Sequence, residues 1–592
     1  MTVFGRLTTA LFWLVTLCCF CAFHTGLRRR MSPLAPLRRA EALLANPPSW
    51  LLALGLGLAV LYGLFLRLYQ FPALPGGVNQ DGAMAALDAA ALVQYGTDRL
   101  GTPWPAHLEA WGKGQMSALL SYILAGMFKL FGQSRLTFRL PQMVISLAAL
   151  AVGWDFARRT LGKRYGWLAL VLLLINPWHV MQSRWTIDCA LFPHLFLFGA
   201  YCLLRGFDRQ GWYYGAAFFF ALAMYSYGIA LYTVPFFLVA VMAALLAQRR
   251  IRWYNALGIT ALYLLLSAPF LATMLLNYAG GENYTLFGLT IQFYRDSIRA
   301  SEIVLLRPDW YAGFAANAQY LVQVLLTQTD GYVYMDLPRY GAHYLFALPL
   351  MVVGMACYIG DRIHKKAAWL GEGEAAGHSS LQAKWGMLLT VFWLLAAVWA
   401  CLVTDGVHYG RAAILLYPVV FMTAYAVWRI AKRGRLLALL LAACYLVGAA
   451  GFGTNYFSGK TQHDLGRYYY AGLVDAMQAA RGRAMDTLYV TQSLPEENQY
   501  GIPEEVLLQY ALQLDPLYVR GQKQVTDAHG RVWASFEDRY QLVDMTTFYI
   551  DPQEEALYIV YDMDINDFNP ADFTVESYGD YYLVTPNALL GA

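Results

Sequence analysis

Seven polar or charged residues recur at the ends of apolar spans, in loops expected on one side of a membrane. They are Asp81, Glu109, Lys113, Arg184, Asp188, His408 and Arg411. A carboxylate can take a proton from a hydroxyl group, and Lys or Arg can hold a phosphate. The set suits a lipid-linked phosphate substrate, with its prenyl chain among helices and its head group at the water interface. We expect Asp81 to be the leading carboxylate.

Several of these residues also have a purely structural interpretation. Asp81 precedes a helical run that starts at Gly82, so it could cap that helix. Arg184 and Asp188 have the i,i+4 spacing of an ion pair on a helix. Arg411 opens an apolar span and could snorkel to the interface. The spacing alone leaves these alternatives open.

The composition indicates an integral membrane protein. Of 592 residues, 58% are hydrophobic and only 14% are charged, whereas soluble domains carry about 25% charged residues. From Phe457 onward the chain carries 21 acidic and 8 basic residues, although the whole chain has a net charge of +4. A basic membrane part joined to an acidic water-soluble part fits this split. The cations are scattered over helix ends, so nucleic acid is not an expected partner.

Eleven apolar spans of roughly membrane length set the expected topology. They are 49–69, 140–157, 165–180, 189–204, 212–228, 230–248, 254–276, 343–360, 385–403, 411–430 and 436–454. Lys and Arg concentrate in alternate loops, beginning with Arg28–Arg39, which the positive-inside rule assigns to the cytoplasm. The other loops, and everything after Gly453, are then extracytoplasmic.

This topology predicts three parts. Residues 1–48 form a hydrophobic segment and a basic cytoplasmic linker, and whether residues 8–25 cross the membrane stays open. Residues 49–455 form a transmembrane domain with large outer loops at 71–141 and 277–342. Residues 456–592 form an acidic extracytoplasmic α/β domain.

Local patterns predict helices in the loops and mixed structure in the last part. We expect loop helices at Gly82–Gln94, Gln115–Phe131, Thr290–Leu306 and Asp309–Thr327. We expect C-terminal helices at Asp464–Ala480 and Pro503–Gln513, and strands at Thr487–Thr491, Leu557–Tyr561 and Tyr581–Thr585. The eight cysteines lie in or beside apolar spans and form neither a disulfide framework nor a zinc pattern.

Several motifs, in their order along the chain, resemble glycosyltransferase family 39. This family includes protein O-mannosyltransferases and aminoarabinose lipid A transferases, in the GT-C fold class. The motifs are Asn79-Gln-Asp81-Gly, Gly112-Lys113-Gly-Gln, Arg135-Leu-Thr-Phe-Arg139-Leu-Pro141, Asn176-Pro-Trp-His179 with Ser183-Arg184 and Asp188, Tyr225-Ser-Tyr227, and His408-Tyr-Gly-Arg411. The resemblance implies an α-helical polytopic membrane protein of GT-C type, with about 11–12 transmembrane helices and a small C-terminal α/β domain.

The resemblance also implies roles for individual residues. Asp81 matches the proposed general base of the family, and Lys113 matches its contact to the donor phosphate. Asp188 matches an acidic position that would orient Asp81 or raise its pKa. Two departures stand out: Gly82 replaces the second acid of a common Asp-Glu pair, and Lys113-Gly-Gln replaces Lys-Pro-Pro.

The expected function is therefore transfer of a sugar from a polyprenyl-phosphate donor to an acceptor hydroxyl, with inversion, at the extracytoplasmic face of the plasma membrane. Arg184, Arg411 and His408 would help Lys113 to bind the donor phosphate, and Glu109 would contact the acceptor or the loop. The acceptor could be a lipid, a protein or a cell-wall glycopolymer. No cofactor is required, although the acidic pair could bind a divalent cation. The alternative is a transporter or lipid flippase without covalent chemistry.

Overall fold

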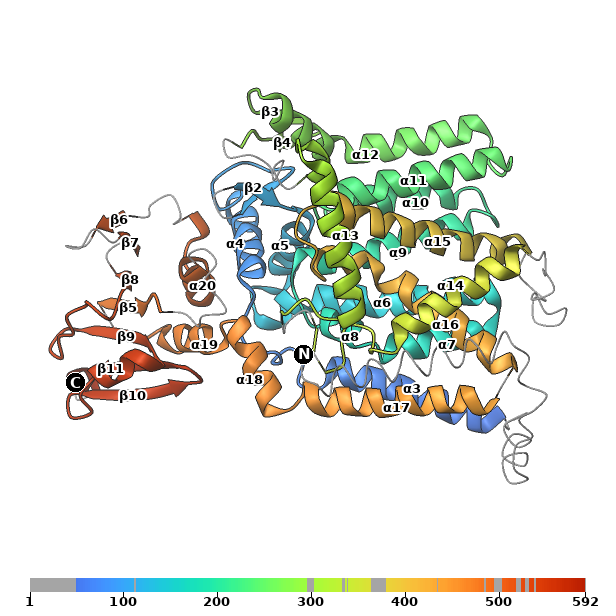
Figure 1. Cartoon of the computed structure of the whole chain (residues 1–592). Helices are drawn as coiled ribbons and strands as arrows, with labels where there is room; N and C mark the ends of the chain where they lie inside the picture. The colour runs from blue at the N-terminus through green and yellow to red at the C-terminus, as the bar shows by residue number, and fades with distance from the viewer. Residues whose placement is uncertain are drawn as a thin grey trace.

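We describe a computed structural model of the chain. The structure describes residues 49–110, 113–294, 303–332, 336–337, 339–363, 380–433, 435–483, 486–493, 503–517, 523–526, 532–536 and 539–590. The N-terminal hydrophobic segment and the basic linker lie outside the described residues. In the described part, the chain forms a helical bundle followed by a C-terminal sheet (Figure 1).

Seven helical segments in the described residues are long and apolar enough to cross a membrane. The helices that contain them are α3 (Ser49–Leu68), α6 (Arg135–Leu161), α11 (Ala230–Ala247), α12 (Trp253–Ala279), α15 (Ser380–Val403), α16 (Leu416–Arg433, preceded by the 3-10 helix η6, Arg411–Leu415) and α17 (Arg435–Tyr456). Each corresponds to one expected span. The prediction of a polytopic helical membrane protein is confirmed.

The other four expected spans are helices of only 12 to 17 residues. They are α7 (Lys163–Leu174), α9 (Phe192–Arg205), α10 (Trp212–Met224) and α14 (Ala347–Ile363). The span expected at 165–180 is interrupted because Asn176 caps a separate short helix, α8 (Pro177–Ser183), with Pro177 at its first position. The turn that contains Asp188 lies between the end of α8 at Ser183 and the start of α9 at Phe192.

Two helices run across one end of the bundle (Figure 1). They are α4 (Gln80–Tyr95) and α5 (Leu119–Phe131). Between them lies a hairpin of β1 (Leu108–Ala110) and β2 (Lys113–Met116), so the helix expected from Gln115 begins only at Leu119. The α4 prediction is confirmed to within two residues at each end.

The second long loop contains one expected helix and one unexpected hairpin. Helix α13 (Trp310–Thr327) matches the prediction for Asp309–Thr327. The helix expected at Thr290–Leu306 is wrong where the chain is described. There β4 (Leu289–Ile291) pairs with β3 (Tyr284–Leu286), and a single 3-10 turn, η4, covers Val304–Leu306. The β-branched residues Thr290 and Ile291 favour the strand.

The C-terminal part is a seven-stranded mixed sheet with helices between it and α4 (Figure 1). The strand order is β10 (Phe573–Tyr578), β11 (Tyr581–Pro586), β9 (Ala556–Tyr561), β5 (Thr487–Thr491), β8 (Tyr540–Val543), β7 (Val532–Phe536) and β6 (Lys523–Thr526). Strand β5 runs parallel to both neighbours. The three predicted strands are present.

The helices of this part are α18 (Gly459–Tyr468), α19 (Ala471–Ala480), α20 (Pro503–Leu512) and the short α21 (Asn587–Leu590). The single helix expected over Asp464–Ala480 is in fact two helices, separated at Tyr469 and Tyr470. Helix α20 packs against α4, and α19 packs against β11. The C-terminal part therefore contacts the helix that carries Asp81.

Candidate active site

Asp81 lies in the first turn of α4 and is half-buried. The cap of this helix is Asn79, whose side-chain oxygen accepts a hydrogen bond from the Asp81 backbone N–H at 2.9 Å. The interpretation of Asp81 as the cap is therefore wrong. A carboxylate in the first turn interacts favourably with the positive end of the helix dipole.

Gly82 allows this helix end to lie directly against the segment before Asp188. A Cβ atom at position 82 would lie 2.3 Å from the carbonyl oxygen of Thr186 and 3.1 Å from the ring of Phe138. No side chain of any size fits there. The missing second acid is thus explained by packing, because the space it would need contains the backbone of Thr186.

The same contact brings two carboxylates close to one thiol. Asp188 begins the 3-10 helix η2 (Asp188–Ala190), and its Oδ1 accepts from the Cys189 N–H at 2.7 Å. Burial raises the pKa of the Cys189 thiol well above its usual value, and the negative charges of Asp188 and Asp81 raise it further. Of the seven predicted residues, Asp81 and Asp188 therefore both lie near the Cys189 thiol.

Two buried arginines hold the chain that leads from α3 to Asp81. Arg139 of α6 donates to the carbonyl oxygens of Pro72 (2.7 Å) and Gly77 (2.8 Å). Arg184, the residue after α8, donates to the carbonyl oxygens of Leu66, Arg67, Tyr69 and Leu74 at 2.6 to 3.2 Å. Burial lowers the pKa of the Arg184 guanidinium, and the nearby Tyr456 opposes this shift.

These contacts give Arg184 a structural role. Both terminal nitrogens bind backbone carbonyls, and the guanidinium also stacks on Phe457 at 5.4 Å from the ring centre. Arg184 and Asp188 do not lie on one helix, because α8 ends at Ser183 and Asp188 begins η2. The predicted contact of Arg184 to a donor phosphate has no support in this geometry.

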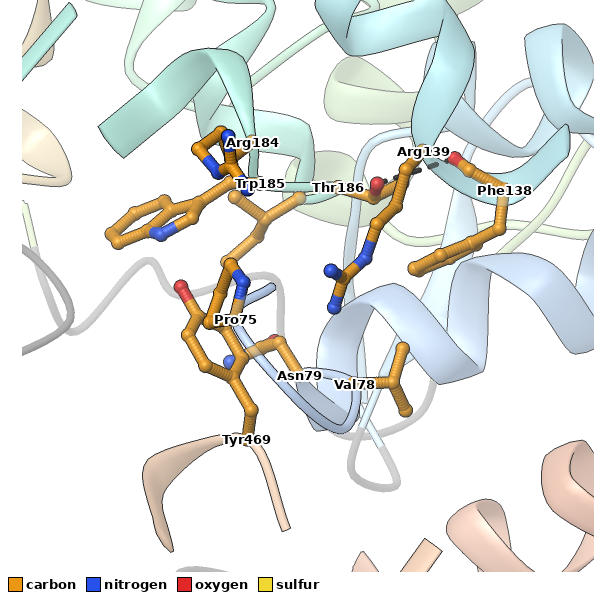
Figure 2. A pocket seen from close by; sticks show the side chains of 10 residues that line it. Pro75, Val78, Asn79, Phe138, Arg139, Arg184, Trp185, Thr186 and Tyr469 are labelled. Carbon is orange, nitrogen blue, oxygen red and sulfur yellow. Dashed lines mark hydrogen bonds between the residues drawn. The ribbon is translucent and has the colours of Figure 1, made fainter. Parts of the chain in front are cut away.

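A pocket with an empty volume of about 320 Å³, including space open to solvent, lies beside the start of α4. Its lining comes from the loop before α4, the start of α6, the turn after α8 and the α18–α19 junction. Figure 2 shows Arg139 reaching from α6 toward Val78 and Asn79, with Thr186 bonded to the carbonyl of Phe138 and Tyr469 closing the opposite side. The segments before Asp81 and Asp188 thus share one cavity.

Glu109 and Lys113 lie on the β1–β2 hairpin, toward the other end of α4. Arg99 connects them to the helix: it donates to Asp88 at 2.7 Å and to the Glu109 carbonyl at 2.8 Å. Asp88 lies seven residues after Asp81, or about 10 Å along a helix axis. The Lys113 backbone pairs with Ala110, while the Glu109 side chain is half-buried. Arg99 therefore joins this hairpin to the middle of α4.

His408 and Arg411 lie on one turn at the start of η6. The carbonyl of His408 accepts from the Ala412 N–H at 2.9 Å. Between them, the Tyr409 N–H donates to Asp330 at 2.7 Å, and the Asp330 N–H donates to Asp336 at 3.1 Å. Burial raises the pKa of Asp336, and so does the charge of Asp330. The turn with both predicted phosphate contacts is thus held by the second long loop.

A chain of buried side chains connects the end of α3 to the Asp188 turn. Its steps are Arg67 to His179 (3.0 Å), His179 to Tyr417 (3.4 Å), Tyr417 to His194 (2.6 Å), His194 to Ser146 (3.0 Å), and Gln142 to both Ser146 (3.4 Å) and the carbonyl of Ala190 (3.2 Å). Because a guanidinium only donates, Nδ1 of His179 accepts from Arg67, which leaves the proton of the neutral His179 ring on Nε2.

The sequence indicated the leading acid of the candidate site, Asp81, but not the residues that position it. Asp88 carried a usable signal, because it is a lone acid in a run of Ala, Leu and Met. Arg139 and Arg184 stood in the quoted motifs, but their partners are backbone carbonyls of distant residues, which no sequence pattern shows. Within the described ranges, no group of three or more His, Cys, Asp or Glu side chains is arranged to hold a metal ion.

A family model supports the resemblance drawn from the motifs. The model described as dolichyl-phosphate-mannose-protein mannosyltransferase matches residues 116–273. This range includes Arg184 and Asp188, and it begins after Asp81 and Lys113. No curated protein sequence matches the chain significantly.

Solved structures of membrane glycosyltransferases are similar to the chain at low identity. ArnT from Cupriavidus metallidurans bound to undecaprenyl phosphate has 14% identity and a TM-score of 0.48, covering 92% of this chain and 99% of its own. The Archaeoglobus fulgidus oligosaccharyltransferase with Zn and sulfate has 12% identity and a TM-score of 0.46, covering 77% and 61%. AglB from the same organism, with an inhibitory peptide and a dolichol-phosphate, has 12% identity and a TM-score of 0.44, covering 78% and 64%.

Proposed function

We propose that this protein is a membrane glycosyltransferase that uses a lipid-phosphate sugar donor, with Asp81 as the general base. The observation that carries the proposal is the packing of Gly82 on Thr186, which leaves Asp81 and Asp188 at one site beside a pocket. The family match to residues 116–273 supports the reaction class. The charge distribution of the loops supports an extracytoplasmic location for the site.

The proposed reaction is a single displacement. The acceptor hydroxyl oxygen attacks the anomeric carbon, and the bond from that carbon to the phosphate oxygen breaks. The hydroxyl proton passes to Asp81, and polyprenyl phosphate leaves with the bonding electrons. Attack opposite the leaving group inverts the anomeric configuration. The protein supplies a base, a positioned acceptor and charge for the leaving phosphate.

Each of the other predicted site residues except Arg184 has a proposed role in this reaction. Lys113, on the hairpin that Arg99 joins to Asp88 of α4, is proposed to bind the donor phosphate. His408 and Arg411, on their shared turn, are further candidates for the donor phosphate. Asp188 is proposed to orient Asp81 and to raise its pKa through like-charge repulsion. Glu109, on the same hairpin as Lys113, is proposed to contact the acceptor.

The test is a release assay with the purified full-length protein and a panel of polyprenyl-phosphate sugars. We expect release of polyprenyl phosphate by the wild type. Asp81→Asn should reduce kcat about 100-fold or more, because general-base catalysis contributes about 10²–10⁴-fold. The matched control is Asp98→Asn, in the same loop, because Asp98 caps a tight turn through the N–H groups of Leu100 and Thr102.

The outcomes separate the candidate functions. Undiminished release by Asp81→Asn would remove Asp81 from the base role. A folded wild type that releases no polyprenyl phosphate from any donor would overturn the glycosyltransferase proposal and favour a transporter or flippase.

A further inference from the structure

The junction between α18 and α19 lies directly against the loop that leads into Asp81. The Val78 N–H donates to the Tyr469 carbonyl at 2.7 Å. The Tyr470 hydroxyl donates to the side-chain oxygen of Gln80 at 2.6 Å. Both bonds join residues about 390 positions apart in the sequence, and Gln80 is the residue immediately before Asp81.

The close approach of the two segments depends on Gly77. This residue has φ +68°, and a Cβ atom there would lie 2.0 Å from the Tyr469 carbonyl oxygen and 2.6 Å from the Ala471 nitrogen. Only glycine satisfies both the left-handed backbone and the lack of space. Arg139 donates to the carbonyl oxygen of the same Gly77, so this point of the loop is held from two sides.

The junction itself has an unusual backbone. Tyr470 has φ +52° and ψ +39°, the left-handed region that a bulky side chain rarely adopts. It lies between the end of α18 and the start of α19 and is 4% exposed. This conformation sets the direction in which the Tyr470 ring leaves the backbone and reaches Gln80. Strain of this kind persists where surrounding contacts fix it, and it is concentrated at functional sites.

The junction is also anchored on the sheet side. A Cβ atom at Gly472, in the first turn of α19, would lie 2.1 Å from the Tyr578 carbonyl oxygen at the end of β10. The backbone of α19 therefore rests on the β10–β11 hairpin. Through this contact, the sheet supports the two tyrosines that hold the start of α4.

We propose that Tyr470 is a positioning residue for the Asp81 base, so that the C-terminal part sets the placement of the catalytic carboxylate. The inference rests on the proposed function. Gly82 fixes Asp81 against Thr186 on one side, and the Tyr470–Gln80 bond fixes the first helical turn on the other. Loss of this bond frees Gln80 and lets the Asp81 carboxylate leave its position relative to the acceptor hydroxyl.

A matched control exists at the other end of the same helix. The Tyr95 hydroxyl donates to Asp515 at 2.7 Å, so α4 is joined to the C-terminal part by a tyrosine bond near each end. If these bonds only hold the two parts together, Tyr470→Phe and Tyr95→Phe should have similar effects. If Tyr470 positions the base, only its loss should change the chemical step.

The experiment measures release of polyprenyl phosphate by the full-length wild type, Tyr470→Phe, Tyr95→Phe, Gln80→Met and the Tyr470→Phe/Gln80→Met double variant. We expect Tyr470→Phe and Gln80→Met each to lower kcat about tenfold, with the donor KM within twofold of wild type. The double variant should be no slower than either single variant, because both remove the same bond. Tyr95→Phe should retain the wild-type kcat. Gln80→Met tests the bond independently if Tyr470→Phe does not fold.

Equal kcat values for Tyr470→Phe and Tyr95→Phe, or additive losses in the double variant, would overturn the inference while the proposed function stands. An increase in KM at unchanged kcat would overturn it too, since misplacement of the base acts on the chemical step. A folded wild type without release from any donor overturns the proposed function, and the inference falls with it.

Discussion

Gly82 is the residue whose role changed most between sequence and structure. In the sequence it marks the loss of an acid, and in the structure it marks a backbone contact with Thr186. We expect Gly82→Ala to lower kcat at least tenfold, because its methyl group must displace either Thr186 or the start of α4. Release of polyprenyl phosphate and thermal unfolding in detergent would measure the effect.

Gly126 provides the control for this substitution. It is also a helical glycine, but a Cβ atom there would meet nothing within 4 Å. Gly126→Ala should keep full activity and gain up to about 1 kcal/mol of stability, as expected for alanine in a helix. Equal activity of the two alanine variants would show that the close contact between Gly82 and Thr186 is not needed for catalysis.

For single residues, the sequence predicted the candidate acid Asp81 but not the side chains that hold the segments around it. Asp81 was found because it is the first charge after an apolar span. The role of Arg184 was not, because its partners are the carbonyl oxygens of residues 110 to 118 positions earlier in the chain. A side chain that binds backbone leaves no complementary residue in the sequence to suggest the pair.

An ion pair between Asp88 and Arg99 joins the middle of α4 to the hairpin that contains Lys113. Both side chains of the Asp88–Arg99 pair are almost fully buried, and burial raises the pKa of Asp88 to about 6. We expect Asp88→Leu alone to cost about 3–5 kcal/mol, because it leaves a buried guanidinium without its counterion. The double variant Asp88→Leu/Arg99→Met should cost less than Asp88→Leu. Chemical unfolding in detergent would measure both.

The partly exposed ion pair Arg135–Asp475 is the control for the buried Asp88–Arg99 pair. Its side chains are 32% and 41% exposed, so Arg135→Met should cost only about 0.2–1 kcal/mol. A cost of Asp88→Leu as small as that of Arg135→Met would contradict the structural role of the buried pair.

Elements were predictable where a long pattern determined them. The α4 and α13 helices were predicted because each is a run of more than ten residues that lacks proline and is rich in helix-forming residues. The β1–β2 and β3–β4 hairpins were missed because strands of three or four residues have too short a pattern. The break between α18 and α19 was missed because it occurs at two tyrosines, without the glycine or proline that usually marks such a break.

On the scale of the whole molecule, the separation of charge predicts which way the protein lies in the membrane. The α11–α12 turn with Arg250 is expected in the cytoplasm, and the C-terminal sheet outside. We predict that an impermeant thiol reagent labels Gln553→Cys in intact cells, whereas Arg250→Cys is labelled only after permeabilisation. Both positions are exposed.

Little labelling of native cysteines is expected in this experiment. The described native thiols are buried, except for the half-buried Cys444. Cys18, Cys19 and Cys21, outside the described residues, would be replaced by serine. Labelling of Arg250→Cys in intact cells would reverse the proposed orientation and place the candidate site in the cytoplasm.

Arg139 and Arg184 hold the loop before Asp81 through its backbone. This has a consequence for which residues of the loop can change during evolution. The hydrogen bonds described above join the two arginines to four carbonyl oxygens of that loop and to two at the end of α3. Every amino acid offers the same carbonyl, so most positions between Tyr69 and Gly76 can mutate without losing an acceptor. We therefore expect homologues to share the path of this stretch while its side chains other than the prolines vary, and the two arginines and Gly77 to stay fixed.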